Sequence, residues 1–365
     1  MDLKSYTLEE LKNHVEPALS DKDGIVPVSP LRLISYLNNP RAEKSDHVLF
    51  EIRVDGKLVA YRTLLPDLYI NQTNSARRFA WLSGNYVKPE FRRQGLSTRL
   101  LQSAEALWDG KLMYTNYAPA SKAVYDRTGQ FPMMAHRPGK RFYLRSASGE
   151  LLGKRLRGRP GSQKLLKTGD QLVNRLRERK LQSFKPVDHS LCKIERIAHL
   201  GPELTPVIEQ SQASSLFCRD AEVFAWILDF PWVTDQRAGP LDYEFSYRAN
   251  RFENILLKFT LRDSRGSGLL WLVLHNQKLS APYLFFDNPD LQPLMATTLV
   301  HTMITRNCAH ATIRQPLLVE NLMKQRKWFL SVRNMPQNLY AHKKIAHEIP
   351  ADLTLQDGDG DMVFS

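Results

Sequence analysis

A short basic segment after a largely apolar strand holds the residues of this sequence best suited to bind an anion. The strand spans residues 79–87, and a proline-led turn containing Arg92, Arg93 and Gly95 follows it. An amphipathic pattern typical of a helix begins at Leu96. Glycine lets successive backbone amides point at one anion, and a helix start adds unpaired N–H groups and a positive dipole end. This order predicts a site for a phosphate-bearing ligand.

The spacing of this segment differs from that of the common nucleotide loops, because G-x-x-x-x-G-K-[ST] and G-x-G-x-x-G are both absent. It matches V-x-P-x-[FY]-R-x-x-G-[IL]-[GA] at six positions, namely Val87, Pro89, Phe91, Arg92, Gly95 and Leu96. The segment therefore resembles the acetyl-CoA pyrophosphate loop of the GNAT superfamily of acyltransferases. Ser97 departs from the final Gly or Ala, but it is small and its hydroxyl could cap the helix.

The resemblance implies which residues would hold the co-substrate. The pyrophosphate of acetyl-CoA is expected on the loop and the helix start, at Arg92, Arg93, Gln94, Gly95, Leu96 and Ser97. The backbone of Val87 is expected to orient and polarise the thioester. No metal is expected.

A second segment fits the same family further along the chain. Residues 116–131 resemble N-x(5–8)-A-x-Y-x-x-x-G-F, with one extra residue before the phenylalanine. In the family this tyrosine protonates the leaving thiolate, which assigns the role of general acid to Tyr125; a phenol pKa of about 10 suits a thiol of about 8.5. Asn116 is expected to hold the pantetheine arm or a water. A helix tyrosine that only packs against the sheet is the alternative for Tyr125.

The sequence does not identify a general base. The strand before the loop, residues 78–87, contains no Asp or Glu. Four other groups are available and no spacing selects among them: Glu51, Asp67, His47 and His136. Residues 83–85 (Ser-Gly-Asn) predict an irregular strand at the point where the family opens its sheet for pantetheine.

Length and composition bound the class of protein. The 365 residues, 42% of them hydrophobic, suit two domains with real cores. Because no run of 18 apolar residues and no signal-peptide pattern occurs, we expect no membrane span and a cytoplasmic location. Cys192, Cys218 and Cys308 are far apart and odd in number, which indicates free thiols and no zinc site.

The net charge of +13 is concentrated between residues 154 and 185, where eleven Lys or Arg accompany two acids. Part of this segment has apolar residues at helical spacing. Three interpretations stay open: a connecting helix with a solvated face, contact with an anionic membrane, and binding of nucleic acid. The last is least favoured, because no aromatic residues interleave with the charges.

The predicted elements of residues 1–146 follow the GNAT order: helices opening at Thr7 and Pro30, a hairpin over 48–64, then strand, helix, strand and helix. A similar order repeats from residue 186, but an acidic segment (287–290) replaces the basic loop. We therefore predict an α/β (α+β) protein with tandem GNAT-like domains, each a mixed, mostly antiparallel twisted sheet flanked by helices. The boundaries are 1–146, a basic and partly helical linker at 147–185, and 186–365. An unrelated second α/β domain is the alternative.

The resemblance implies an N-acetyltransferase that moves an acetyl group from acetyl-CoA to a primary amine by direct attack in a ternary complex. The acceptor is a small molecule or a peptide, and a homodimer is open. One alternative is a non-catalytic acyl-CoA-binding or membrane- or nucleic-acid-associated scaffold. Another alternative is a relative of the FemAB-type aminoacyltransferases. The intact pyrophosphate loop argues against this second alternative.

Overall fold

Short-range signals in the sequence define the first helix and the first hairpin. The helix predicted to open at Thr7 begins with a capping box of Thr7 and Glu10, with the Thr7 amide 2.9 Å from Oε2 of Glu10 and the Glu10 amide 3.3 Å from Oγ1 of Thr7. At the hairpin tip, Asp55 (φ 51°) and Gly56 (φ 75°) both adopt the left-handed backbone that a type I′ turn requires. Both predictions are confirmed.

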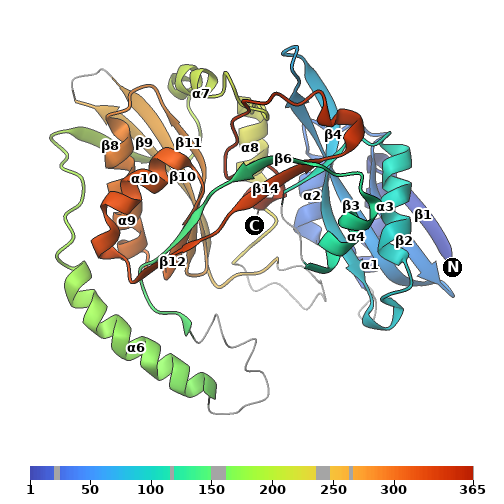
Figure 1. The fold of residues 1–365 in the computed structure, drawn as a ribbon, viewed down its shortest axis with the longest axis horizontal. Helices are drawn as coiled ribbons and strands as arrows, with labels where there is room; N and C mark the ends of the chain where they lie inside the picture. The colour runs from blue at the N-terminus through green and yellow to red at the C-terminus, as the bar shows by residue number, and fades with distance from the viewer. Residues whose placement is uncertain (20–24, 116–118, 149–161, 236–246, 263–265, 365) are drawn as a thin grey trace. The chain divides into compact units, whose positions relative to one another are not determined.

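A computed structural model describes residues 1–19, 25–115, 119–148, 162–235, 247–262 and 266–364. The chain forms two units, and each draws on separate parts of the sequence (Figure 1). Unit 1 comprises residues 1–136, 211–250 and 337–365, and unit 2 comprises residues 137–210 and 251–336.

The described residues of unit 1 form a sheet in the order β1-β2-β3-β4-β5-β14-β6. Its strands are β1 (Asp2–Thr7), β2 (His47–Val54), β3 (Lys57–Ile70), β4 (Ala76–Val87), β5 (Leu112–Tyr114), β6 (Met133–Arg137) and β14 (Gln337–Ala341). Its helices are α1 (Leu8–Leu19), α2 (Pro30–Leu37), α3 (Leu96–Leu107), α4 (Pro119–Thr128), α8 (Ala221–Asp229) and α11 (Lys343–Ala346). β1 to β4 pair antiparallel, whereas β4 and β5 run parallel.

The core of unit 1 lies between α3 and the sheet. Leu100, Leu101 and Ala104 occupy one face of α3 and are fully buried together with Phe50 of β2 and Leu64 of β3. Burial of this apolar stripe holds the helix against the strands. The start of α3 is therefore fixed relative to the end of β4.

The described residues of unit 2 form a second sheet, in the order β13-β7-β12-β11-β10-β9-β8. Its strands are β7 (Lys140–Tyr143), β8 (Cys192–Ile197), β9 (Phe252–Leu261), β10 (Ser267–His275), β11 (Lys278–Phe286), β12 (His310–Ile313) and β13 (Ser331–Asn334). Its helices are α6 (Ser162–Leu181), α7 (Thr205–Ser211), α9 (Leu291–Thr305) and α10 (Pro316–Lys324). The two mixed, mostly antiparallel sheets flanked by helices confirm the predicted fold class, and α6 confirms a helix in the basic segment.

Each sheet contains a strand from the part of the chain that was predicted to form the other domain. The observed division of the chain therefore differs from the predicted boundaries at residues 146 and 186. β7 precedes residue 146 but pairs with β12 and β13 in the second sheet. β14 lies near the end of the chain but pairs with β5 in the first sheet. Residues 211–250 also belong to unit 1. Pairing between strands this far apart leaves no local pattern in the sequence, which is why the boundaries differ.

Two further observations concern composition. Among the helices in the described ranges, none is long and apolar enough to cross a membrane. Cys192, Cys218 and Cys308 are all free thiols, as expected.

Candidate functional site

The second half of β4 has an open edge, and this opening is the first feature of the site. Among the described residues, β4 pairs with β5 only at Ala80 and Trp81, although β4 continues to Val87. The pairing of β4 with β3 also shifts register between Thr63 and Leu64. The predicted irregularity of this strand is confirmed.

The amide of Val87 faces this open edge. The next amide, that of Lys88, donates to the carbonyl of Val59 at 2.9 Å and so points toward β3. Since successive amides of a strand point to opposite sides, the N–H of Val87 points away from β3. A ligand that enters beside β4 therefore meets a backbone donor here.

The basic loop leads from the end of β4 to the start of α3. After the single turn η1 (Pro89–Phe91), Arg93 (φ 64°) and Gly95 (φ 77°) adopt left-handed backbone. Arg92, Arg93, Gln94 and Gly95 are exposed, and no side chain in the described part of the chain caps the helix at Gly95. The first amides of α3 are therefore available to an anion beside two guanidinium groups.

Several side chains of the loop have local partners. Nε of Arg92 donates to the carbonyl of Val87 at 3.1 Å, which ties the loop to the strand end. Ser97 lies inside the first turn of α3 and does not cap it, because the capping position belongs to Gly95. Its hydroxyl instead accepts from Nδ2 of Asn85 at 3.2 Å. The suggestion that Ser97 caps the helix is wrong.

Tyr125 of α4 is buried against the sheet. Its ring stacks on that of Tyr114 with centroids 4.3 Å apart, and its hydroxyl oxygen accepts from Nη1 of Arg62 at 3.1 Å. Because Arg62 is the donor, the phenolic hydrogen is not used in this bond. Sequence reasoning missed Arg62, which lies on β3 and carries no motif. Asn116 lies outside the described residues.

Arg62 and Asn85 are cross-strand neighbours with polar atoms that lack partners. Nε and Nη2 of Arg62 and Oδ1 of Asn85 are buried, and no group in the described ranges bonds them. Such atoms are costly to leave unpaired. They present donors and an acceptor together, which fits the amide groups of a pantetheine arm.

Comparison with known proteins decides the family of this region. Residues 9–129 match the family model described as acetyltransferase (GNAT) family. Residues 9–129 form a GNAT domain. A search of curated proteins with the sequence gave no match.

Solved structures extend the likeness in fold to both units. The chain is similar to Saccharomyces cerevisiae N-myristoyltransferase with bound myristoyl-CoA, at TM-score 0.51 and 11% identity, over 94% of this chain and 82% of that one. It is also similar to a protein of unknown function from Enterococcus faecalis V583, described as a probable N-acyltransferase, at TM-score 0.50 and 10% identity, over 94% and 73%. At these identities the likeness shows the fold alone, a tandem arrangement of GNAT-like units.

The surroundings or positions of the four candidate bases argue against that role. Glu51 is buried and lies 2.9 Å from Nη2 of Arg53 and 3.1 Å from Nε2 of His14. His136 is exposed on β6, where Nδ1 lies 2.7 Å from Oδ1 of Asn338. His47 lies at the start of β2, on the far side of β3 from β4.

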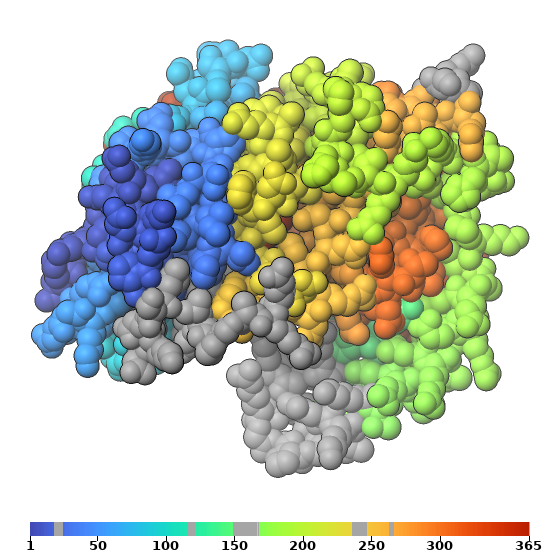
Figure 2. Space-filling view, turned by 180° about the vertical axis from the view of Figure 1, so that it is seen from behind, coloured from blue at the N-terminus to red at the C-terminus, as the bar shows by residue number. Residues whose placement is uncertain are grey.

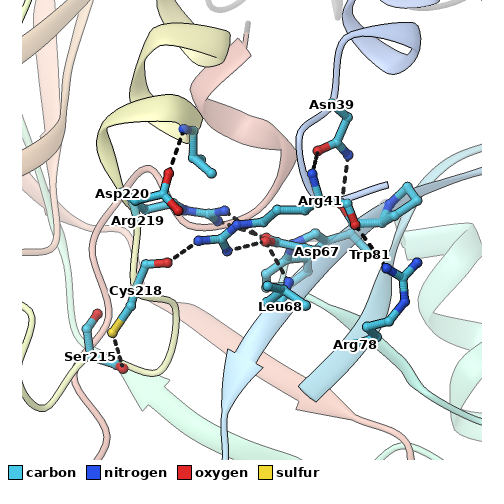
Figure 3. Close-up of polar contacts among 12 residues, drawn as sticks. Asn39, Arg41, Asp67, Leu68, Arg78, Trp81, Ser215, Cys218, Arg219 and Asp220 are labelled. Carbon is cyan, nitrogen blue, oxygen red and sulfur yellow. Dashed lines mark hydrogen bonds and ion pairs between the residues drawn. The ribbon is translucent and has the colours of Figure 1, made fainter. Parts of the chain in front are cut away.

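Asp67 instead anchors residues 211–219 to the GNAT domain (Figure 3). Its carboxylate accepts from Arg41 at 2.6 Å, from both Nη atoms of Arg219 at 2.9 Å and from the indole of Trp81 at 2.8 Å. Burial alone would raise the pKa of Asp67, but the charges of Arg219 and Arg41 outweigh it and lower that pKa to about 2. A carboxylate this weakly basic cannot take a proton from an ammonium group.

The C-terminal segment supplies a carboxylate that sequence reasoning missed. Asp361 begins the turn η4 (Asp361–Phe364), and its Oδ2 accepts a hydrogen bond from the hydroxyl of Ser83 on β4. Nη2 of the buried Arg32 donates to Ser83 at 2.7 Å and to Thr63 at 2.8 Å. The guanidinium of Arg32 stacks 4.2 Å from the ring of Trp232. Asp361 is half-buried, so it borders the opening while held in place.

The backbone of Gly360, the residue before Asp361, lies at the fork between β4 and β5. A Cβ built on Gly360 would lie 3.7 Å from Oγ1 of Thr115 and 3.9 Å from the ring of Trp81. Thr115 follows β5, and Trp81 is the last residue of β4 that pairs with it. The segment therefore lies where the two strands diverge. No local pattern around Asp361 could have revealed this, since its contacts come from residues far away in the sequence.

Proposed function

We propose that the chain is an acyl-CoA-dependent N-acyltransferase that transfers an acyl group, acetyl in the simplest case, to a primary amine by direct attack in a ternary complex. The observation that carries this proposal is the loop from Val87 to Leu96. Exposed arginines, left-handed Gly95 and an uncapped helix start meet there at an open strand edge. Acyl-CoA supplies the activated acyl group.

The binding residues are those of the basic loop together with the strand edge. Arg92 to Ser97 surround the pyrophosphate, with Arg92 and Arg93 adding charge to the amides. The Val87 amide donates to the thioester oxygen, and Arg62 with Asn85 faces the pantetheine amides. We assign this role to unit 1 alone, because the corresponding segment of unit 2 carries Asp287 and Asp290 before α9, and these would repel a diphosphate.

Tyr125 is the proton donor to the sulfur that leaves. Arg62 holds its oxygen, and the hydrogen stays available to a thiolate. When the amine nitrogen bonds to the acyl carbon, the carbon–sulfur bond breaks and the phenol gives its proton to sulfur. The acylated nitrogen releases its remaining extra proton to solvent. The resulting phenolate, beside the Arg62 cation, regains a proton from solvent before the next cycle.

Asp361 is the base that accepts the proton of the attacking ammonium group. Its carboxylate lies at the fork of β4 and β5, beside β4, which has no acid of its own. The hydroxyl of Ser83 holds one carboxylate oxygen, which leaves the other to face the acceptor. The alternative is that Asp361 only anchors the C-terminal segment.

A thiol-release assay tests the proposed function. The full chain is incubated with acetyl-CoA and a panel of primary amines that includes amino sugars, polyamines and lysine-containing peptides, while calorimetry measures CoA binding separately. Binding with amine-dependent release supports the transferase. Binding without release of thiol on any amine favours the non-catalytic scaffold, and absence of binding removes both.

A further inference from the structure

The outer face of α6 in unit 2 combines exposed apolar side chains with arginines. Leu172 and Leu176 are 63% and 65% exposed, and Val173 is 40% exposed. Arg175 and Arg179 are exposed on the same stretch of helix. Neighbouring leucines this exposed are unusual on a surface that contacts only solvent. This face of α6 is therefore a candidate binding surface.

The opposite face of α6 holds the helix to unit 2. The carboxylate of Asp170 accepts a hydrogen bond from the hydroxyl of Ser146. Oδ1 of Asn174 accepts a second one from the backbone amide of Ser146 at 2.8 Å. Glu178 pairs with the buried Arg145 at 2.6 Å. Figure 1 shows α6 at the periphery of this unit, and its light-green atoms lie at the edge of the space-filling view (Figure 2). The outward direction of the leucines is therefore set by the anchored face.

A lysine-lined cavity of about 610 Å³ opens at the C-terminal end of α6. Its lining is basic and aromatic: Ser183, Phe184, Lys185, Thr297, Lys324, Gln325, Lys327 and Trp328. Nζ of Lys327 lies 5.5 Å from the centroid of the Trp328 ring, and the Phe184 ring meets that ring edge-on at 5.1 Å. Lys324 is paired with Glu320 at 2.9 Å, so Lys185 and Lys327 provide most of the uncompensated charge.

The cavity and the leucines lie along one face. Leu172, Leu176 and Lys180 follow one another at four-residue spacing, which places them in a row on the helix. Nζ of Lys180 donates to the carbonyl of Lys327 at 2.7 Å, at the cavity wall. The apolar row thus leads directly to the basic cavity.

We propose that the outer face of α6 and this cavity form a docking surface for a bilayer that contains anionic lipids. Leucines flanked by arginines, whose long side chains can reach the headgroups, are typical of helices that lie in the membrane interface. The cavity would seat a lipid phosphate between Lys185 and Lys327, beside a tryptophan of the kind that prefers the interface. Nucleic acid would leave the leucines in water, which is why the lipid surface is favoured.

Vesicle co-sedimentation of the full chain tests this proposal independently of acyl transfer. The expected result is binding to phosphatidylcholine vesicles that contain phosphatidylglycerol, with little binding to phosphatidylcholine alone and weaker binding at high salt. The double variant Lys185→Glu/Lys327→Glu should lower the apparent affinity by more than about tenfold, as should Leu172→Ser/Leu176→Ser. Matched controls are Lys57→Glu in the hairpin of unit 1 and Leu191→Ser, which is 58% exposed elsewhere in unit 2.

Equal binding to both vesicle types, or binding that neither double variant weakens more than its control, would overturn the proposal. So would tight binding of a nucleic-acid duplex that Lys185→Glu/Lys327→Glu weakens and Leu172→Ser/Leu176→Ser leaves unchanged. All four substituted side chains of the two double variants are on the surface, so unchanged melting temperatures will verify that each variant is folded.

Discussion

The hydroxyl of Ser83 donates a hydrogen bond to the carboxylate of Asp361, although the two residues are 278 positions apart in the sequence. This bond brings an acid to a strand that has none between residues 78 and 87. The C-terminal segment thereby becomes part of the opening beside β4, where we propose that the co-substrate binds.

Replacing Asp361 with asparagine removes the proposed base and keeps the side chain's shape. We expect turnover to fall by about 10²- to 10⁴-fold, with the affinity for CoA unchanged. Turnover of the variant should also recover as pH rises, because a larger share of the acceptor amine is then already deprotonated and needs no base. The control is Asp352→Asn, an exposed acid in the same segment. Wild-type turnover and pH profile in Asp361→Asn would leave Asp361 as an anchor only.

Tyr125→Phe separates chemistry from binding. The ring keeps its stacking on Tyr114, and only the hydroxyl that accepts from Arg62 is lost, at a stability cost of about 1 kcal/mol. Turnover should fall at least about a hundredfold while CoA affinity measured by calorimetry stays within about twofold. Tyr6→Phe on β1 serves as the control. A proportional loss of CoA affinity would instead assign Tyr125 to binding.

Gly95→Ala tests the pyrophosphate loop. A Cβ at Gly95 meets nothing within 4 Å, so the expected cost comes from the left-handed φ of 77° and is about 1 kcal/mol of stability. The change should also weaken CoA binding by about tenfold, because strain in the loop redirects the amides. Gly56→Ala is a close control, since Gly56 has φ 75° and equal space. The site would be verified if both variants lose a similar amount of stability and only Gly95→Ala binds CoA more weakly.

The buried carboxylate of Asp67 predicts how unit 1 responds to acid. Its pKa is lowered from 3.8 to about 2, so it contributes about 2 kcal/mol to the free energy of unfolding above pH 4, and this is lost as pH falls through about 2. At neutral pH, Asp67→Asn should cost about 3–5 kcal/mol, because Arg41 and Arg219 lose their shared partner. The difference in the free energy of unfolding between wild type and Asp67→Asn should become smaller at acid pH.

Denaturant titrations between pH 2 and pH 7 measure this gap. Asp2→Asn, which removes an exposed pair with Lys4, should change stability by less than about 1 kcal/mol throughout. A constant gap between wild type and Asp67→Asn across the acid range would contradict the assigned pKa.

Local sequence was sufficient for the features that depend on a few neighbouring residues. The capping box at Thr7, the turn at Asp55-Gly56 and the start of α3 at Leu96 all follow from backbone preferences that act within four residues. The GNAT loop belongs to this group, since six of its positions lie between Val87 and Leu96. Helical spacing also revealed α6, because apolar periodicity survives without knowledge of the packing partner.

Tertiary structure alone decided which distant segments share a sheet or a site. β14 pairs with β5 and β7 with β12, and these pairings depend on how the whole chain crosses between units. Arg62 and Asp361 carry no motif, so only their burial and hydrogen bonds mark them. The physical reason is that a strand or a carboxylate gains its partner through long-range packing, which short stretches of sequence do not encode.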